Sequence, residues 1–270
     1  MTGAADAPGG PRLRSVTATR YVTAFREGGS LPGLVEADDD GLYVVKFRGA
    51  GQGGLALVAE WLAGEIGRAL GLLVPEIVEV VLPAPIAEAE PHEEIHDLLV
   101  SSVGSNVGLD FLPGSLTFNP AADRVADPDW AADVVWFDAF VMNPDRSVKN
   151  PNLLVWHGRT WLIDHGAALY VHHTWRDPGE HARRPFDRSV EHVLLPYAGS
   201  IAASDERLAP LVTRSLLETL AAEVPDAWLP ADSAVGDRGA QRGSYVDYLL
   251  ARLDARRAFV EEADRVRAAA

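Results

Sequence analysis

The chain has 270 residues, of which 47% are hydrophobic, so it is long enough to bury a full core. Its 39 acidic residues outnumber its 24 basic ones, and the formal net charge of −15 argues against nucleic-acid backbones or anionic membranes as general partners. The absence of cysteine excludes disulfides, thiolate catalysis and zinc–thiolate sites. The sequence contains no run of about 20 apolar residues and no apolar signal core near its start. We therefore expect a cytoplasmic protein without a transmembrane segment.

The N-terminal region has the pattern of strands and turns. Residues 1–14 begin with a stretch rich in alanine, glycine and proline, so we expect a disordered tail there. β-prone runs at residues 20–25 and 34–36 flank a glycine-rich turn. A turn of three aspartates and a glycine then leads into a strand that ends at Lys46. The pattern predicts a β-rich first part of the fold.

A helix is predicted next, followed by more extended segments. Apolar side chains at Val58, Leu62, Ile66 and Ala69 recur at helical spacing, which predicts an amphipathic helix over residues 55–70. After it we expect a strand region at 72–82, a connector at 83–91, a short helix at 92–101 and an extended segment at 107–112.

Helices dominate the remainder of the chain. Apolar patterns predict them at residues 130–142, 208–223 and 245–266. The whole pattern indicates an α+β chain with two unlike lobes and a hinge near residues 110–114. We expect a β-rich N-lobe over residues 15–112 and a mainly helical C-lobe over residues 113–270.

The chain contains 22 arginines but only two lysines, Lys46 and Lys149. Lysine carries a compact charge on a flexible stem, whereas arginine carries a wide planar fork, so a retained lysine suggests a specific use. Lys46 ends a strand, and Lys149 lies four residues after Asp145 in a loop that follows an apolar helix. A lysine on a strand, a loop with Asp and Asn, and a later Asp-x-Gly form the layout of a phosphotransfer site.

The first half of this layout concerns phosphate binding. Gly28, Gly29 and Ser30 lie in a turn between two predicted strands, where backbone N–H groups could cover phosphates, although such a turn is more often only a turn. Lys46 would reach the α- and β-phosphates, held by a carboxylate from the next helix. Glu60 and Glu65 are both candidates, and helical periodicity alone does not choose between them.

The second half concerns the chemistry. Asp145 could orient or deprotonate an acceptor hydroxyl, while Asn150 and Asp164 could bind a metal through oxygen. Asn152 is an alternative to Asn150, because a bulge in the loop would bring it to the same place.

A predicted hairpin between these residues tests the metal site. Apolar runs at residues 153–156 and 160–163 flank His157-Gly158. A three-residue loop with Gly158 in the left-handed conformation pairs Val155 with Arg159 and places Asp164 opposite Asn150. A two-residue loop places Asp164 opposite Pro151 instead. Only the three-residue loop assembles two oxygen ligands for Mg²⁺, so the backbone conformation at Gly158 decides whether this pairing forms.

These motifs together resemble the HipA-like kinases, relatives of the phosphatidylinositol kinases within the protein-kinase-like superfamily. The resemblance covers most of residues 20–170. It is carried by a helix that ends at Leu70-Gly71-Leu72 with a proline soon after, by Phe137-Asp138-Ala139-Phe140 with Asn143, Asp145 and Lys149-Asn150, and by Ile163-Asp164-His165-Gly166.

The resemblance has several implications. It implies a bilobal protein-kinase-like fold and the use of ATP and Mg²⁺. Counted back from Gly71-Leu72, it favours Glu60 as the partner of Lys46. It also implies that backbone groups of Asp110, Phe111 and Leu112 hold the adenine.

Other motifs in the sequence fit other functions less well. His92-Glu93-Glu94-Ile95-His96 matches the H-E-x-x-H pattern of zinc peptidases, but Pro91 precedes it and no third ligand follows at a recognisable spacing. His172-His173 likewise lacks further ligands. A nucleotide-binding pseudokinase or sensor would not need Asp145.

We therefore expect an ATP- and Mg²⁺-dependent phosphotransferase that acts on a Ser or Thr hydroxyl of an unidentified protein. A lipid or small-molecule acceptor is the alternative.

Overall fold

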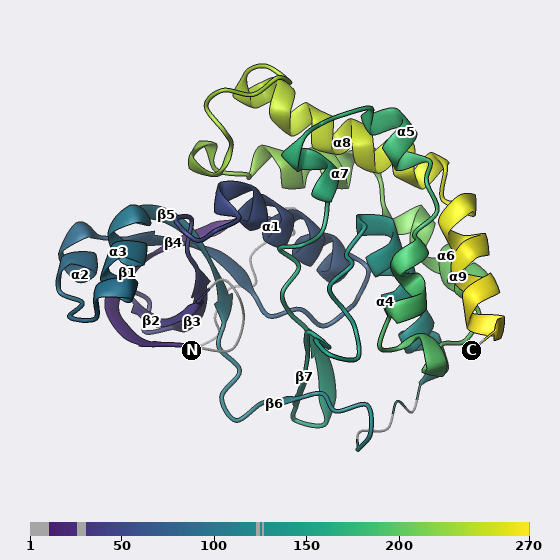
Figure 1. The fold of residues 1–270 in the computed structure, drawn as a ribbon, viewed down its shortest axis with the longest axis horizontal. Coiled ribbons are helices and arrows are strands. Elements are labelled where there is room, and N and C mark those ends of the chain that lie inside the picture. Colours follow the sequence, from purple (N-terminus) through teal and green to yellow (C-terminus); the bar gives the residue numbers. More distant parts are fainter. Residues whose placement is uncertain (1–10, 26–30, 123–124, 126, 270) are drawn as a thin grey trace, which may run out of the picture.

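The computed structural model describes residues 11–25, 31–122, 125 and 127–269. Its N-terminal part is a closed barrel, and its C-terminal part is mainly helical (Figure 1). The barrel strands follow the order β1-β2-β3-β5-β4 and comprise β1 (Arg14–Ala24), β2 (Gly33–Ala37), β3 (Leu42–Lys46), β4 (Ile77–Leu82) and β5 (Gly104–Asp110).

The barrel closes through a parallel pair between β1 and β4. All the other pairs of adjacent strands in the barrel are antiparallel. Alternate side chains point inward, as strand geometry requires, and Val16, Val35, Val45 and Val78 are all buried there. The expected tail ends earlier than residue 14. Arg14 is already in β1, and the Leu13 N–H donates to Glu223 Oε2 at 3.1 Å.

Helix α1 (Gly53–Ala69) lies between the barrel and the C-terminal helices (Figure 1). The predicted helix over residues 55–70 is confirmed, but its amphipathic character is not, because every residue from 57 to 64 is buried. Trp61 shows the reason, since its indole N–H donates to the Leu220 carbonyl at 2.9 Å on the C-terminal side. A helix with packing partners on several sides has no solvent face along this stretch.

Two short helices lie beside the barrel, next to β1 (Figure 1). They are α2 (Ala84–Glu88), in the segment expected to be only a connector, and α3 (Glu93–Ser101). Ala87 and Leu99 on these helices join the buried cluster of the barrel. Strand β5 then returns along β3 and β4 and ends where the chain leaves the barrel.

Helix α4 (Pro128–Val141) opens the helical part. Asp127 caps its start by accepting hydrogen bonds from the Asp129 and Trp130 N–H groups, and Met142 ends it in the left-handed conformation. The helices that follow are α5 (Pro178–Ala182), α6 (Ile201–Leu208), α7 (Arg214–Ala222), α8 (Arg238–Asp254) and α9 (Arg257–Ala269).

Two of the predicted long helices are divided in the structure. The segment 208–223 contains the end of α6, a turn and α7, and the segment 245–266 is broken between α8 and α9. Within the ranges given above, no helix combines the length and apolar character needed to cross a bilayer.

A small antiparallel sheet lies between the barrel and the helices and contains β6 (Leu116–Thr117), β7 (Leu153–Trp156) and β8 (Arg159–Leu162). Of the two loop types considered for the hairpin, the two-residue loop occurs. Trp156 pairs with Arg159 and Val155 with Thr160, which leaves only His157 and Gly158 in the loop. Both loop residues have positive φ angles, 47° and 71°, as a type I′ turn requires. The same register places Asp164 opposite Pro151 rather than Asn150.

Candidate active site

Lys46 lies at the centre of an ionic cluster formed by three distant segments. Its ammonium is 2.5 Å from Glu60 Oε2, and it also pairs with Asp164 Oδ1. Lys46 ends β3, Glu60 lies on α1, and Asp164 follows β8. Glu60, not Glu65, is therefore the partner of Lys46, whereas Glu65 pairs with Arg68 on its own helix at 3.1 Å.

The three side chains of the cluster differ in their exposure to solvent. The Glu60 side chain is 0% exposed and that of Lys46 is 12% exposed, whereas that of Asp164 is 41% exposed. Burial opposes the charge on Lys46 and Glu60, but their attraction outweighs burial. The pKa of Lys46 therefore lies above its ordinary value, with help from Asp164, and the pKa of Glu60 lies well below its own, with help from His165. Both groups are charged at neutral pH.

Asp164 adopts a backbone conformation that is costly for a residue with a side chain. Its φ angle is 58°, in the left-handed region, and such residues cost about 1–3 kcal/mol unless their surroundings hold them. The next residue provides that support, because the His165 N–H donates to Glu60 Oε2 at 2.9 Å. Backbone strain of this kind is concentrated at functional sites.

Asp145 is held by three asparagines. Its backbone N–H donates to Asn143 Oδ1 at 3.2 Å, and its carboxylate accepts from Asn150 Nδ2 at 3.0 Å and from Asn152 Nδ2 at 3.3 Å. Asn152 also donates to the Asp145 carbonyl at 2.6 Å. The structure therefore brings both candidate metal-binding asparagines to Asp145, with Asn152 buried and Asn150 exposed.

A second ionic cluster anchors the loop that carries Asp145. Arg146 donates to both oxygens of Asp138, at 2.5 and 3.3 Å, and to the Asn152 carbonyl at 2.5 Å. His192 Nε2 lies 2.8 Å from Asp138 Oδ2. Burial opposes ionisation of Asp138, but Arg146 and His192 hold its pKa well below the ordinary value. The buried contacts of this cluster therefore hold the loop in place.

No specific role was predicted for the members of this second cluster. A signal was nevertheless present, because Asp138 is a charged residue inside an apolar helical run, and buried carboxylates require partners. The identity of those partners depends on long-range contacts, since His192 is 54 residues away.

The segment expected to hold adenine follows β5. The Asp110 N–H donates to the Glu76 carbonyl and the Phe111 N–H to the Leu42 carbonyl, each at 2.9 Å. The Leu112 N–H makes no hydrogen bond within the described part of the chain. Gly28, Gly29 and Ser30, the expected phosphate cover, lie outside the described residues.

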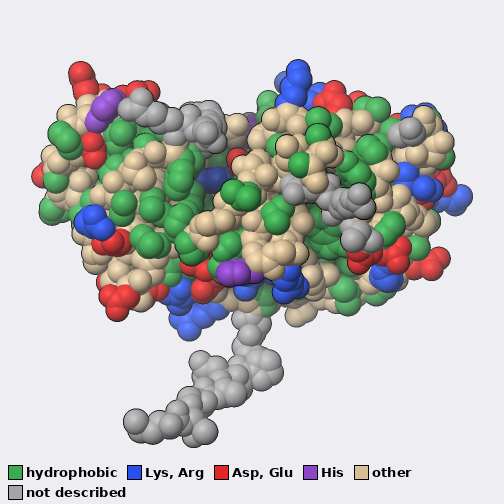
Figure 2. All heavy atoms as spheres, turned by 90° about the horizontal axis from the view of Figure 1, so that it is seen from below, with side chains coloured by type: hydrophobic (Ala, Val, Ile, Leu, Met, Phe, Trp, Pro, Cys, Tyr) green, Lys and Arg blue, Asp and Glu red, His purple; other side chains and the backbone are tan. Residues whose placement is uncertain are grey.

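The surface between the barrel and the helical part is hollowed (Figure 2). In this view, basic and acidic side-chain atoms lie inside the hollow, between two rims where apolar side chains are prominent. Opposite charges at the base of an open cleft can bind a ligand that carries both anionic and cationic groups.

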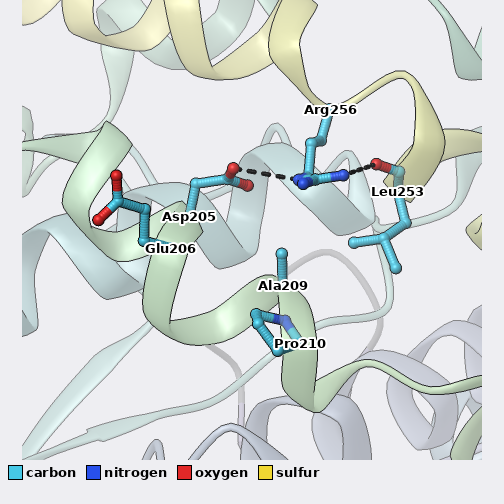
Figure 3. A pocket seen from close by; sticks show the side chains of 6 residues that line it. All are labelled: Asp205, Glu206, Ala209, Pro210, Leu253 and Arg256. Carbon is cyan, nitrogen blue, oxygen red and sulfur yellow. Dashed lines mark hydrogen bonds and ion pairs between the residues drawn. The ribbon is translucent and has the colours of Figure 1, made fainter.

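A separate surface cavity of about 260 Å³ lies among α6, α8 and the turn before α9 (Figure 3). Its Asp205 accepts from Trp136 Nε1 at 2.8 Å and pairs with Arg256 at 3.1 Å. None of the residues discussed above lines it. These contacts give Asp205 a structural role in joining helices.

The motifs behind the rival functions lie elsewhere. His92 precedes α3 and His96 lies in its first turn, with His96 Nδ1 3.4 Å from Asp97. His172 is buried, and its Nδ1 lies 3.2 Å from the Tyr245 hydroxyl. Across the ranges that the structure describes, no three His, Asp or Glu side chains gather as a metal-binding group.

Comparison with known proteins identifies the family. The model of the HipA-like kinase family matches residues 19–261, which is most of the chain. The chain therefore belongs to the HipA-like kinases, and it is a kinase, that is, a phosphotransferase. No curated protein sequence matches it.

One solved structure supports the kinase-like fold. The Helicobacter pylori proinflammatory kinase CtkA is 12% identical and has a TM-score of 0.57, covering 96% of this chain and 99% of its own. A Golgi casein kinase solved with Mn and ADP bound is 12% identical, with a TM-score of 0.42, over 90% of this chain and 73% of its own.

Proposed function

We propose that this kinase transfers the γ-phosphate of ATP, with Mg²⁺, to a Ser or Thr hydroxyl of a protein. The observation that supports this proposal most strongly is the Lys46 cluster, in which one ammonium contacts Glu60 and Asp164, 118 residues away from it. The barrel, residues 15–112, and the helical part, residues 113–270, would act as the two lobes around the nucleotide.

Lys46 is suited to bind phosphate because its second partner is exchangeable. Glu60 is fully buried and holds the ammonium in place, while Asp164 is open to solvent. Phosphate oxygens can therefore replace Asp164 as partners of Lys46, and this releases the Asp164 carboxylate. We propose that the Leu112 N–H, which has no hydrogen-bond partner among the described residues, donates to the adenine ring, and that Gly28, Gly29 and Ser30 cover the phosphates.

Asp145 is the proposed catalytic base. Its two carboxylate oxygens accept hydrogen bonds from the side-chain amides of Asn150 and Asn152, and these bonds orient the carboxylate. In this role it would accept the proton of the acceptor hydroxyl as the oxygen attacks the γ-phosphorus and the bond to the ADP leaving group breaks. The buried contacts of Arg146 hold the loop during this step.

The two side chains proposed to bind Mg²⁺, those of Asp164 and Asn152, offer the oxygen ligands that this ion prefers. Asp164 offers a carboxylate. The amide nitrogen of Asn152 is bonded to Asp145, which leaves its amide oxygen available as a ligand. When bound, Mg²⁺ would neutralise charge on the phosphate oxygens.

Asn152 is the better of the two candidate asparagines. It is buried and has a positive φ angle of 48°, so its conformation is held by the fold. Its carbonyl also accepts from the Ile163 N–H at 3.1 Å, which joins it to the segment that carries Asp164. Asn150 is exposed, and the hairpin register that favoured it does not occur. We propose Asn152 and Asp164 as the metal ligands.

A protein acceptor is supported by exposed apolar side chains beside the catalytic loop. Val148 is 62% exposed in the loop, and Val190 is 62% exposed in the segment that pairs with it through the Ser147–His192 bridge. Exposed apolar side chains that lie close to a reactive group can provide contacts for a polypeptide.

A transfer assay tests this proposal. The wild type is incubated with γ-labelled ATP, Mg²⁺ and a dephosphorylated protein mixture, followed by phosphoamino-acid analysis. We expect Asp145→Asn to lower transfer by about 10²–10⁴-fold while keeping the nucleotide-induced rise in melting temperature. Asp247→Asn, at a 78% exposed aspartate of α8, is the control and should transfer at the wild-type rate.

Three outcomes would contradict parts of the proposal. Transfer by Asp145→Asn at the wild-type rate would exclude its role as the base. Label on lipid or a small molecule, with none on protein, would assign the alternative acceptor. Nucleotide binding without any transfer would favour a sensor or pseudokinase.

A further inference from the structure

His165, the residue after Asp164, contacts Glu60 in two ways. Its backbone N–H donates to Glu60 Oε2 at 2.9 Å, and its ring Nδ1 lies 3.4 Å from Glu60 Oε1. Both oxygens of this buried carboxylate are therefore engaged, one by Lys46 and the His165 backbone, the other by the His165 ring. Because an ionised carboxylate only accepts hydrogen bonds, Nδ1 must carry the hydrogen.

The imidazole is completely buried. His165 is 0% exposed, and its ring meets the ring of Phe137 edge-on, with centroids 5.8 Å apart. Its Nε2 has no hydrogen-bond partner among the described residues. Among the described residues, the ring thus makes one polar contact, which is to Glu60 Oε1.

These contacts connect Lys46, Glu60 and the segment of Asp164 to one another. Lys46 binds Glu60 and Asp164, and Glu60 binds the residue next to Asp164. Glu60 therefore fixes both the cation and the strained segment that carries Asp164. A side chain that aligns the Glu60 carboxylate will influence the separation of Lys46 and Asp164, although it touches neither a phosphate nor a metal.

We propose that His165 is a positioning residue, whose ring hydrogen bond orients Glu60 and so sets the arrangement of Lys46 and Asp164 for phosphoryl transfer. This inference rests on the function proposed above. The competing explanation is that the imidazole only fills space against Phe137. The two explanations predict opposite orders of activity for the same substitutions.

Three variants separate positioning from packing. His165→Asn keeps a donor near the position of Nδ1 but leaves a cavity beside Phe137. His165→Gln moves its donor toward the position of Nε2, and His165→Phe fills the space without a donor. If His165 positions Glu60, Asn retains more activity than Gln or Phe. If His165 only packs, Phe retains the most activity and Asn the least.

The measurements are ADP release with Mg²⁺-ATP, Mg²⁺-ATP binding by calorimetry, and thermal unfolding without nucleotide. We expect His165→Phe to unfold near the wild-type temperature and its kcat to fall about ten- to a hundredfold. We expect its KM for ATP to change less than kcat, because the substitution leaves the proposed adenine contacts of residues 110–112 unaltered. His165→Asn should recover much of the lost kcat despite a lower melting temperature.

A double-mutant cycle tests whether the effect passes through Glu60. In a Glu60→Gln background, adding His165→Phe should change activity by less than about threefold, because the group that His165 orients is already altered. A full, independent loss in that background would overturn the inference, as would wild-type kcat in His165→Phe.

The outcomes also separate this inference from the function on which it rests. If the wild type binds Mg²⁺-ATP without turnover, the order of binding affinities decides, and Asn binding no better than Phe overturns the inference. If the wild type neither binds nor turns over Mg²⁺-ATP, the proposed function is contradicted and this inference with it.

Discussion

The two ionic clusters of this kinase contain the same three kinds of group and differ in exposure. Each places a carboxylate on a buried helix, Glu60 on α1 or Asp138 on α4, next to a cation and a histidine. In the first, the cation is a lysine that reaches the partly exposed Asp164. In the second, the cation is an arginine with no solvent exposure of its side chain.

This difference matches the chemistry of the two cations. Arginine binds Asp138 through a rigid fork and uses a third nitrogen on the Asn152 carbonyl, so its position is fixed by several bonds. Lysine carries a point charge that can change partners. We infer that the Arg146 cluster holds the catalytic loop while the Lys46 cluster exchanges Asp164 for phosphate, and that this explains a lysine in an arginine-rich chain.

The largest expected effect on stability comes from breaking the Arg146 cluster. Asp138→Asn leaves the buried Arg146 without its carboxylate, and breaking a buried pair costs about 3–5 kcal/mol. Asp133→Asn on the same helix is the matched control, since it breaks only the partly exposed pair with Arg207. Chemical denaturation should show a loss below about 1 kcal/mol for this control. Equal losses would contradict the distinction between the clusters.

A third buried histidine sharpens the comparison. His165 and His192 each face a carboxylate, whereas His172 faces Tyr245 and His173. Burial, with a smaller effect of His173, lowers the pKa of His172 to about 3. The unfolded chain then binds a proton below pH of about 6.5 while the folded chain does not. Folding stability is therefore complete above that pH and falls as the pH drops toward the folded pKa.

The expected loss is about 2 kcal/mol between pH 6.5 and pH 5, from about 1.36 kcal/mol per pH unit. Glu60 and Asp138, whose pKa values are lowered, contribute fully in this window and lose their contribution only at lower pH. Denaturation curves at both pH values check this, and His172→Asn should flatten the dependence. An unchanged slope in the variant would assign the effect to other groups.

The smallest expected effect distinguishes the two asparagines. Asn152→Ala removes a buried amide that donates to the Asp145 carbonyl, whereas Asn150→Ala removes an exposed one. We expect Asn152→Ala to raise the Mg²⁺ concentration needed for half-maximal turnover about tenfold, in line with loss of one metal ligand or its support. The reverse order would restore Asn150 as the ligand.

Much of the candidate site could be proposed from the sequence because it depends on local order along the chain. The positions of Lys46, Asp145 and Asp164 follow from strand, loop and turn patterns, and the family resemblance favoured Glu60. Helical periodicity could not decide between Glu60 and Glu65, because the middle of α1 is buried on all sides. This stretch therefore has no solvent-facing polar side that would distinguish the two residues.

The features that could not be predicted from the sequence depend on backbone geometry or on contacts between distant segments. The hairpin register follows from His157 adopting a left-handed conformation, which its side chain permits but does not require. The parallel β1–β4 pair and the Asp138–His192 contact join segments far apart in the chain, and neither leaves a local pattern.

The most direct test of the central claim is a thermal-shift titration with Mg²⁺, ATP and both together. We predict a rise in melting temperature that needs both ligands, equivalent to about 2.7 kcal/mol at a hundred times the dissociation constant. Lys46→Ala should diminish it, whereas Arg257→Ala, at an 88% exposed position on α9, should leave it unchanged. No shift in the wild type at millimolar ATP, or an undiminished shift in Lys46→Ala, would contradict the account.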